Sequence, residues 1–269
     1  MSFRDKGFLD DALDGWIQKI YDDNKDIFNV CVRLSELMVK IQLELKADVN
    51  DIRQLLIACL YIRAVGSYQA AILLLQRGML KDGTILARAL MDAVFRMRAI
   101  GVDVEVAVKY IKEDDSIRRK LANKYNLLSD DVKETQKSER LKELATSLDR
   151  HAELKSQWFA DRAGLSDDYN SMYSLLSNEV HMNVRSIDDL VDRGAGDIVL
   201  GFKIGPSNSK RQLMLILALA GKYGILSVEC CFNVLKLSEH EGLNDIPAQL
   251  KALREQLRSF EKRLLVQSP

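Results

Sequence analysis

Proline and glycine are scarce in this sequence. The 269 residues include 3 prolines and 14 glycines, while 47% of them are hydrophobic and 29% are charged. Proline and glycine are the residues that most strongly disfavour a helix interior, so their scarcity favours long helices. The apolar fraction is large enough for a folded core. The composition therefore predicts an all-α protein.

A net charge is also lacking, because 39 Lys and Arg residues balance 39 Asp and Glu residues. This balance excludes a positive field over the whole surface, although a local basic patch stays open. Residues 1–11 contain no apolar stretch of the kind found in secretory signals. The most apolar segment, 213–220, is followed by Gly221 and Lys222 and is too short to span a bilayer. We expect a cytoplasmic protein without a membrane segment.

The sequence has few histidines and cysteines and lacks the common catalytic motifs. It contains neither CxxC nor G-x-S-x-G, and no phosphate-binding glycine loop. Its four cysteines, which we expect to be buried thiols, are Cys31, Cys59, Cys230 and Cys231. Its histidines, none of which has Glu three residues before it, are His151, His181 and His240. We therefore expect no metal and no cofactor.

Apolar residues recur at helical spacing along most of the chain. This period predicts one domain over 1–269, an all-α bundle of about eight or nine helices. The predicted helices are 9–21, 27–45, 52–79, 85–100, 103–128, 132–159, 167–185, 212–237 and 248–265. Segments 52–79 and 85–100 are apolar around much of their circumference, which places them in the middle of the fold.

Two segments are expected to differ from the helices of the core. Segment 194–209 is rich in glycine and is expected to be a loop or a short hairpin excursion. We expect 27–240 to form the core bundle. Segment 244–266 has a narrow apolar stripe, which predicts a helix that docks a protein partner or pairs with a second copy in a dimer.

Charged residues interrupt the apolar helix 85–100 at regular intervals. Arg88, Asp92 and Arg96 are four residues apart and therefore share one helix face. If that face is buried, its charges need partners. Such a ladder can serve a site, or it can hold helices in register.

A second polar stripe lies in the predicted helix 167–185. Its members, spaced by four, are Tyr169, Tyr173, Ser177, His181 and Arg185. Histidine titrates near neutral pH and can act as an acid or a base. Packing of this stripe against the first would let Asp92 orient His181, while Arg88 and Arg185 hold an anion such as phosphate.

These two stripes define the candidate site. We assign catalytic roles to His181, Asp92 and Arg88. The binding candidates are Tyr173, Ser177, Arg185 and Asn178, the last of which precedes His181 by three residues. The alternative is that the tyrosine, serine and histidine only share buried hydrogen bonds.

The segments SYQAAILLLQRGMLKDGTILARALMDAVFRMRAI (67–100) and YSLLSNEVHMNV (173–184) resemble an uncharacterised bacterial domain-of-unknown-function family, DUF5677. Its pattern has Leu-x-Arg-x-Leu-x-Glu and later Tyr-x-x-x-Ser-x-x-x-His. Arg88, Tyr173, Ser177 and His181 match this pattern, whereas Asp92 replaces the Glu. The family carries no settled activity.

The helix pairs are also distantly similar to HEPN domains, which are common in toxin–antitoxin and phage-defence systems. That resemblance implies a dimer that binds RNA or a nucleotide and cleaves RNA without metal. HEPN ribonucleases place Arg shortly before His, but Ser174, Leu175 and Leu176 stand there. Cleavage would need Arg88 or Arg185 to replace the missing arginine. A non-enzymatic interaction module and a small-molecule sensor with a pocket between helices are the alternatives.

Overall fold

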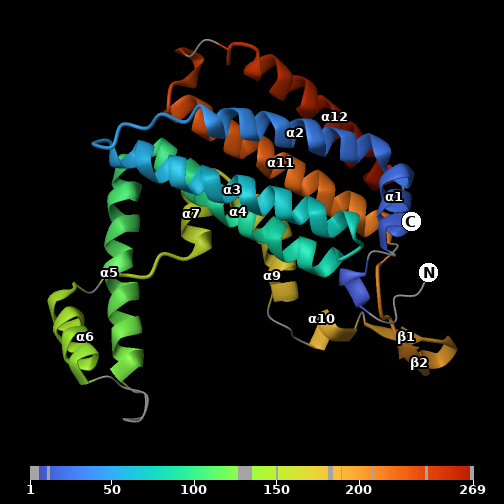
Figure 1. The fold of residues 1–269 in the computed structure, drawn as a ribbon, viewed down its shortest axis with the longest axis horizontal. Helices are drawn as coiled ribbons and strands as arrows, with labels where there is room; N and C mark the ends of the chain where they lie inside the picture. Colours follow the sequence, from blue (N-terminus) through green and yellow to red (C-terminus); the bar gives the residue numbers. More distant parts are fainter. Residues whose placement is uncertain are drawn as a thin grey trace.

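A computed structural model describes residues 6–10, 13–126, 135–149, 151–180, 184–188, 190–207, 209–239 and 242–266. Figure 1 shows an elongated stack of long helices with a small two-stranded sheet at one end. The predicted all-α fold is confirmed.

The helical elements follow one another in a simple order. They are η1 (Gly7–Leu9), α1 (Asp14–Asp23), α2 (Lys25–Leu43), α3 (Ile52–Gln76), α4 (Leu80–Val102), α5 (Val104–Asn126), α6 (Thr135–Ser147), α7 (Ser156–Arg162), α8 (Ser166–Asp168), η3 (Tyr169–Tyr173), α9 (Ser174–Val180), α10 (Val184–Asp188), η4 (Ala195–Asp197), α11 (Lys210–Val234), η5 (Leu237–Glu239) and α12 (Ile246–Val266). The strands are β1 (Val191–Arg193) and β2 (Val199–Phe202).

The helices α3 and α4 form an antiparallel pair in the middle of the molecule, as their apolar composition predicts. Asp51 caps α3 by accepting hydrogen bonds from the backbone N–H groups of Arg53 and Gln54. The turn into α4 uses Gly78 at a φ of +74°, a conformation that favours glycine. α11 packs against α2, α3 and α4, and so completes the core.

Buried tyrosines tie the central helices together. The hydroxyl of Tyr68 on α3 donates to the backbone oxygen of Cys31 on α2 over 2.9 Å. The hydroxyl of Tyr61 donates to the backbone oxygen of Met38 over 3.0 Å. Both rings have no exposed surface, so each polar tip needs this partner. The core therefore fixes the position of α2 along α3.

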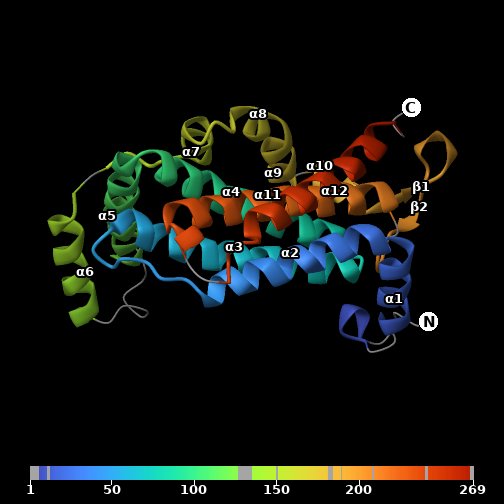
Figure 2. The same ribbon diagram turned by 90° about the horizontal axis from the view of Figure 1, so that it is seen from above.

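The apolar stripe of α12 lies against α11 and α2 (Figure 2). Its buried members are Leu250, Leu253, Leu257 and Phe260. This face is therefore covered within the chain. Pairing with a second copy would need another surface, and the dimer stays a prediction.

In the part of the chain that the structure describes, α3 and α11 are long and apolar enough to cross a membrane, by length and composition alone. Half of the apolar window of α3 and 72% of that of α11 are buried inside the bundle. A central helix of a bundle has the same composition as a spanning helix. The absence of a membrane segment therefore stays a prediction.

One predicted helix, 132–159, is wrong in its extent, because α6 and α7 are separate helices. Buried polar groups of α5 hold the segment between them. The Glu113 carboxylate accepts from the backbone N–H of Leu154 over 2.7 Å. The hydroxyl of Ser116 bonds both backbone groups of His151, over 2.7 and 2.9 Å. These bonds satisfy backbone groups that a continuous helix would use itself.

Predicted helix 167–185 is helical without a break over residues 166–180, and it contains a π-helical turn, η3, between α8 and α9. A short hairpin is present, but it begins before segment 194–209: β1 precedes the segment and pairs antiparallel with β2 inside it, with an irregularity between Asp192 and Arg193. The hairpin and α10 lie at the opposite end of the molecule from α5 and α6 (Figures 1 and 2).

Candidate functional site

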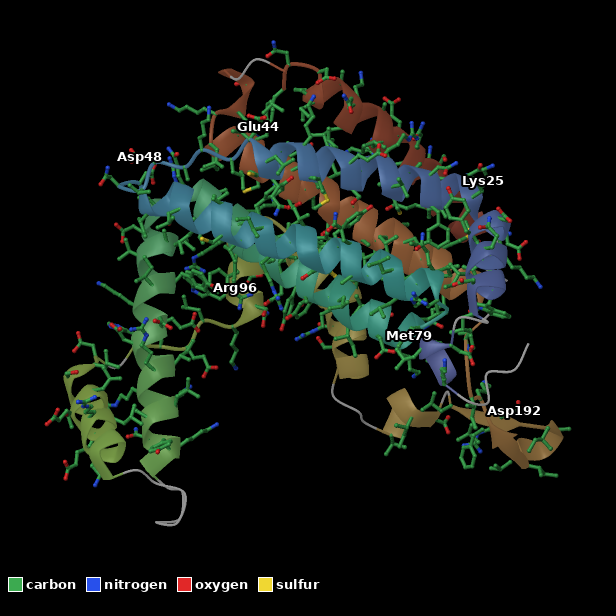
Figure 3. The ribbon with its side chains drawn as sticks, in the orientation of Figure 1. Lys25, Glu44, Asp48, Met79, Arg96 and Asp192 are labelled. Atoms are coloured by element: carbon green, nitrogen blue, oxygen red, sulfur yellow. The ribbon has the colours of Figure 1, made fainter. Side chains whose placement is uncertain are left out.

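The helix α4 presents its charged ladder to α7 and α9. These two short helices pack on α4, on the side away from α2. Figure 3 shows Arg96 under the central helices, close to α7. The side chain of Arg96 is 17% exposed and that of Asp92 is 29% exposed. The ladder is thus a partly buried contact surface between helices.

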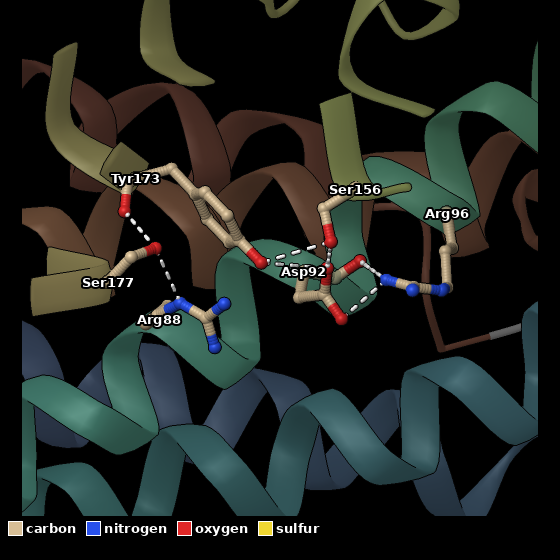
Figure 4. A network of polar contacts seen from close by, with 6 residues as sticks. All are labelled: Arg88, Asp92, Arg96, Ser156, Tyr173 and Ser177. Carbon is tan, nitrogen blue, oxygen red and sulfur yellow. Dashed lines mark hydrogen bonds and ion pairs between the residues drawn. The ribbon is translucent and has the colours of Figure 1, made fainter. Parts of the chain in front are cut away.

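Asp92 is the centre of a polar network that joins the three helices (Figure 4). Its Oδ2 pairs with Nη1 of Arg96, one turn away on α4. Its Oδ1 accepts from the hydroxyl of Ser156 over 2.5 Å and lies 3.3 Å from the hydroxyl of Tyr173. The Tyr173 hydroxyl also lies 3.0 Å from Ser156 Oγ, so its single hydrogen is shared between the two acceptors. Both carboxylate oxygens are therefore occupied.

Arg88 forms the other end of this network. Its Nε donates to Oγ of Ser177 over 2.9 Å. The Ser177 hydroxyl donates in turn to the backbone oxygen of Tyr173 over 2.8 Å. The guanidinium lies 4.6 Å from the centre of the Tyr173 ring, which is within the range of a cation–π contact. The orientation of Arg88 is therefore fixed by two contacts with the segment η3–α9.

The protonation states follow from burial and from the neighbouring charges. Burial raises the pKa of the Tyr173 hydroxyl, and the nearby Asp92 carboxylate acts in the same direction. Burial acts to lower the pKa of Arg96, but the charge and hydrogen bond of Asp92 outweigh it, so that pKa is raised. At neutral pH the tyrosine is a donor and the arginine is a cation.

Aromatic rings anchor η3 to the core. The ring of Phe95 lies 5.4 Å from that of Tyr173 and 5.9 Å from that of Tyr223 on α11. The rings of Tyr169 and Tyr173 are stacked at 5.1 Å. Phe159 of α7 lies under the Arg96 guanidinium, 4.8 Å from ring centre to Cζ. The polar network therefore lies between rigid apolar contacts.

The structure brings together four of the candidates chosen from the sequence: Arg88, Asp92, Tyr173 and Ser177. His181 lies outside the described residues. The same holds for the side chains of Asn178 and Arg185. The roles assigned to these three residues, including the orientation of His181 by Asp92, stay predictions.

Ser156 was not among the sequence candidates, although it bonds both Asp92 and Tyr173. It is the first residue of α7, whereas the sequence places it in the last turn of the predicted helix 132–159. A single serine at the start of a helix is not part of a recognisable sequence motif. Arg96 was recognised as part of the ladder, and its spacing of four from Asp92 is the signal that predicts their pairing.

The described residues hold no group of three histidine, cysteine, aspartate or glutamate side chains arranged for a metal ion. The site chemistry visible in this part of the chain is therefore that of two arginines, one carboxylate and three hydroxyl groups. Formally, the network carries one excess positive charge.

A model of a family of unknown function (DUF5677) matches residues 54–198, which is more than half of the 269 residues. The chain belongs to this family. The DUF5677 match covers α4, α7, η3 and α9, and so includes every residue of the network. No curated protein and no solved structure matches the chain.

Proposed function

We propose that this DUF5677 protein binds RNA or a nucleotide in the cytoplasm, and that Arg88 holds a phosphate group. The observation that carries the proposal is the state of the Arg88 side chain. An arginine has five N–H donors, and its planar fork fits two oxygens of a phosphate. Only Nε of Arg88 is bonded among the described residues, so the four N–H groups of its terminal amino groups have no acceptor there.

The fixed position of Arg88 supports a role in binding an anion and not merely that of a solvated surface charge. A surface arginine loses side-chain entropy when it captures an anion. Here Ser177 and the Tyr173 ring already hold the guanidinium, so less freedom is lost on binding. The formal excess charge of the network has the sign that an anionic ligand needs.

The distant similarity to HEPN domains belongs to this proposal, as do a homodimer and a role in bacterial defence or stress. In the catalytic form of this proposal, the protein cleaves RNA without a metal ion. His181 would act as acid or base, and Arg88 would stabilise the charge on the phosphate. Asp92 already accepts from Arg96, Ser156 and Tyr173, and orienting His181 would require exchanging one of these contacts.

Binding is tested by fluorescence anisotropy with a labelled single-stranded RNA, and by calorimetry with adenosine monophosphate. We expect Arg88→Met to weaken binding about tenfold or more, because charge-assisted hydrogen bonds are lost. Arg88→Lys should recover only part of the affinity, since an ammonium cannot bind two oxygens in a fork. The matched control is Arg140→Met, at an exposed position of α6. Equal affinity of Arg88→Met and wild type would refute the proposal.

Cleavage is tested separately with the same RNA in the presence of a chelator. The catalytic form predicts product with the wild type and none with His181→Ala, at equal melting temperatures. If both proteins bind the RNA and neither cleaves it, the nuclease is excluded and the binding function is retained.

A non-enzymatic interaction module is the second candidate, and one observation favours it. The bonds of Asp92 are satisfied inside the protein and hold α7 and η3 on α4. In this case RNA and nucleotide would both fail to bind, while Asp92→Asn would still lower the melting temperature.

A further inference from the structure

A cavity of about 510 Å³ lies away from the Asp92 network, between the ends of three helices. Its walls are the last turns of α4 and α11 and the first turns of α12. Sites for small molecules occupy about 300–1,000 Å³, so the volume is sufficient for one. None of the network residues lines this cavity.

Basic side chains dominate the charged part of the lining. Arg98 comes from α4, and Lys251 and Arg254 come from α12. Among the described residues of the lining, Glu229 is the only acidic one, and it pairs with Arg254. The charged lining therefore carries three positive charges and one negative charge. An anionic group is the complement of this arrangement.

Arg98 supplies the most specific observation. Its Nε is buried and has no hydrogen-bond partner among the described residues. A buried donor without an acceptor is costly, and such groups are rare in folded proteins. A ligand oxygen in the cavity would satisfy it. Arg98 thus provides a partly buried cation in a wall of the cavity, with Nε lacking an acceptor among the described residues, whereas Lys251 is exposed.

Apart from Asn233, the remaining described residues of the lining are apolar or small. Phe232 and Leu250 are 7% and 5% exposed, and Val234 and Pro247 lie beside them in the wall. Gly101 keeps this end of α4 close to α11, because a Cβ there would lie 3.3 Å from Cys230 Sγ. The site therefore offers a hydrophobic wall next to two cations, Arg98 and Lys251, that form no ion pair with a described acidic residue of the lining.

We propose that this cavity binds a small molecule with an anionic head, a carboxylate or a phosphate monoester, attached to a short apolar body. The head lies against Arg98 and Lys251, and the body covers the apolar wall. This site is separate from the RNA or nucleotide site at Arg88 and does not depend on it.

Isothermal titration calorimetry of the full chain tests this proposal with four probes of equal chain length: octanoate, octyl phosphate, octanol and octylamine. We expect binding of at least one anionic probe and no binding of octanol or octylamine. Preference for octanoate or for octyl phosphate identifies the head as a carboxylate or a phosphate. Equal binding of octanol would refute the anionic site, as would failure of both anionic probes.

Variants locate the bound probe. Arg98→Met should weaken binding at least tenfold, which corresponds to the loss of a charge-assisted hydrogen bond. Lys251→Met should weaken it less, and its exposed position makes it a second test if Arg98→Met does not fold. Lys262→Met is the control, because Lys262 is exposed on α12 and outside the cavity. Unchanged binding in both cavity variants would overturn the proposal.

The cysteine in the wall gives an independent readout. Cys230 Sγ donates to the backbone oxygen of Met97, and the side chain lines the cavity. In a Cys59→Ser background, the bound anionic probe should slow alkylation of Cys230 under mildly denaturing conditions. Arg88→Met should leave this protection unchanged. Protection that is lost in Arg88→Met would place the probe at the other site.

Discussion

Replacement of Asp92 by asparagine tests the polar network most sharply. The substitution keeps the shape and one acceptor oxygen, but it removes the charge that pairs with Arg96. Arg96 keeps a bond from Nη1 to the backbone oxygen of residue 92, over 3.1 Å, and its contact with the Phe159 ring. Its guanidinium loses its ion-pair partner in a mostly buried position.

The expected cost follows from burial. Loss of one partner of a fully buried ion pair costs about 3–5 kcal/mol. The side chains here are 17% and 29% exposed, which lets water replace part of the lost interaction. We therefore expect Asp92→Asn to lower the free energy of unfolding by about 2–3 kcal/mol. For a chain of this size, that is a fall in melting temperature of about 4–8 °C.

An exposed pair of the same geometry provides the control. Asp114 and Arg118 are also four residues apart on a helix and form an ion pair, but their side chains are 50% and 61% exposed. Asp114→Asn should change the free energy of unfolding by less than about 1 kcal/mol. Urea unfolding followed by circular dichroism measures both. Equal effects of the two substitutions would refute the buried network.

The double variant Asp92→Asn/Arg96→Met gives a further check on this reasoning. Removal of both charges should cost less than the sum of the single substitutions, by about 1 kcal/mol or more, because no buried cation is left unpaired. Additive effects would show that the two side chains do not interact.

Other predictions concern packing, thiol chemistry and pH. Gly83→Ala should destabilise the protein by about 1–3 kcal/mol, because its Cβ would lie 2.7 Å from Leu75 Cδ2. Gly66→Ala should instead stabilise it by up to about 1 kcal/mol, since that glycine is exposed on α3 with nothing within 4 Å of an added Cβ. Thermal melting would show both effects, and shifts of the same sign would contradict them. A thiol reagent should modify Cys59 in the native protein and the three buried cysteines only after unfolding, which peptide mass spectrometry can resolve. Burial raises the pKa of the Cys31 thiol from 9.0 to about 12, so stability should fall as the pH rises between these values. Wild type should lose about 1.4 kcal/mol more than Cys31→Ala between about pH 8 and pH 10, and equal losses in urea unfolding would contradict the assignment.

Much of the fold could be predicted from apolar periodicity. The long helices α2, α3, α4, α5, α11 and α12 coincide closely with predicted segments, because each must bury a continuous apolar face. The hairpin at 191–202 follows from its glycines. The break between α6 and α7 could not be predicted, since it depends on tertiary bonds from Glu113 and Ser116 to distant backbone groups.

The candidate site was predictable where it depends on spacing within one helix. Arg88, Asp92 and Arg96 share a face of α4 because they are four residues apart, and Tyr173 and Ser177 share a face for the same reason. Their meeting was inferred from the need of buried charges for partners. Ser156 joins the network through the placement of α7, which no local pattern encodes. The cavity at Arg98 is likewise made by three helix ends that are far apart in the sequence.

A crystal structure of the chain with adenosine monophosphate tests the proposed function most directly. The account predicts phosphate oxygens within hydrogen-bond distance of the terminal amino groups of Arg88, with Asp92 still paired to Arg96. A phosphate bound only in the cavity beside Arg98, or a nucleotide that leaves Arg88 without a contact, would contradict the assignment of the site to α4 and α9.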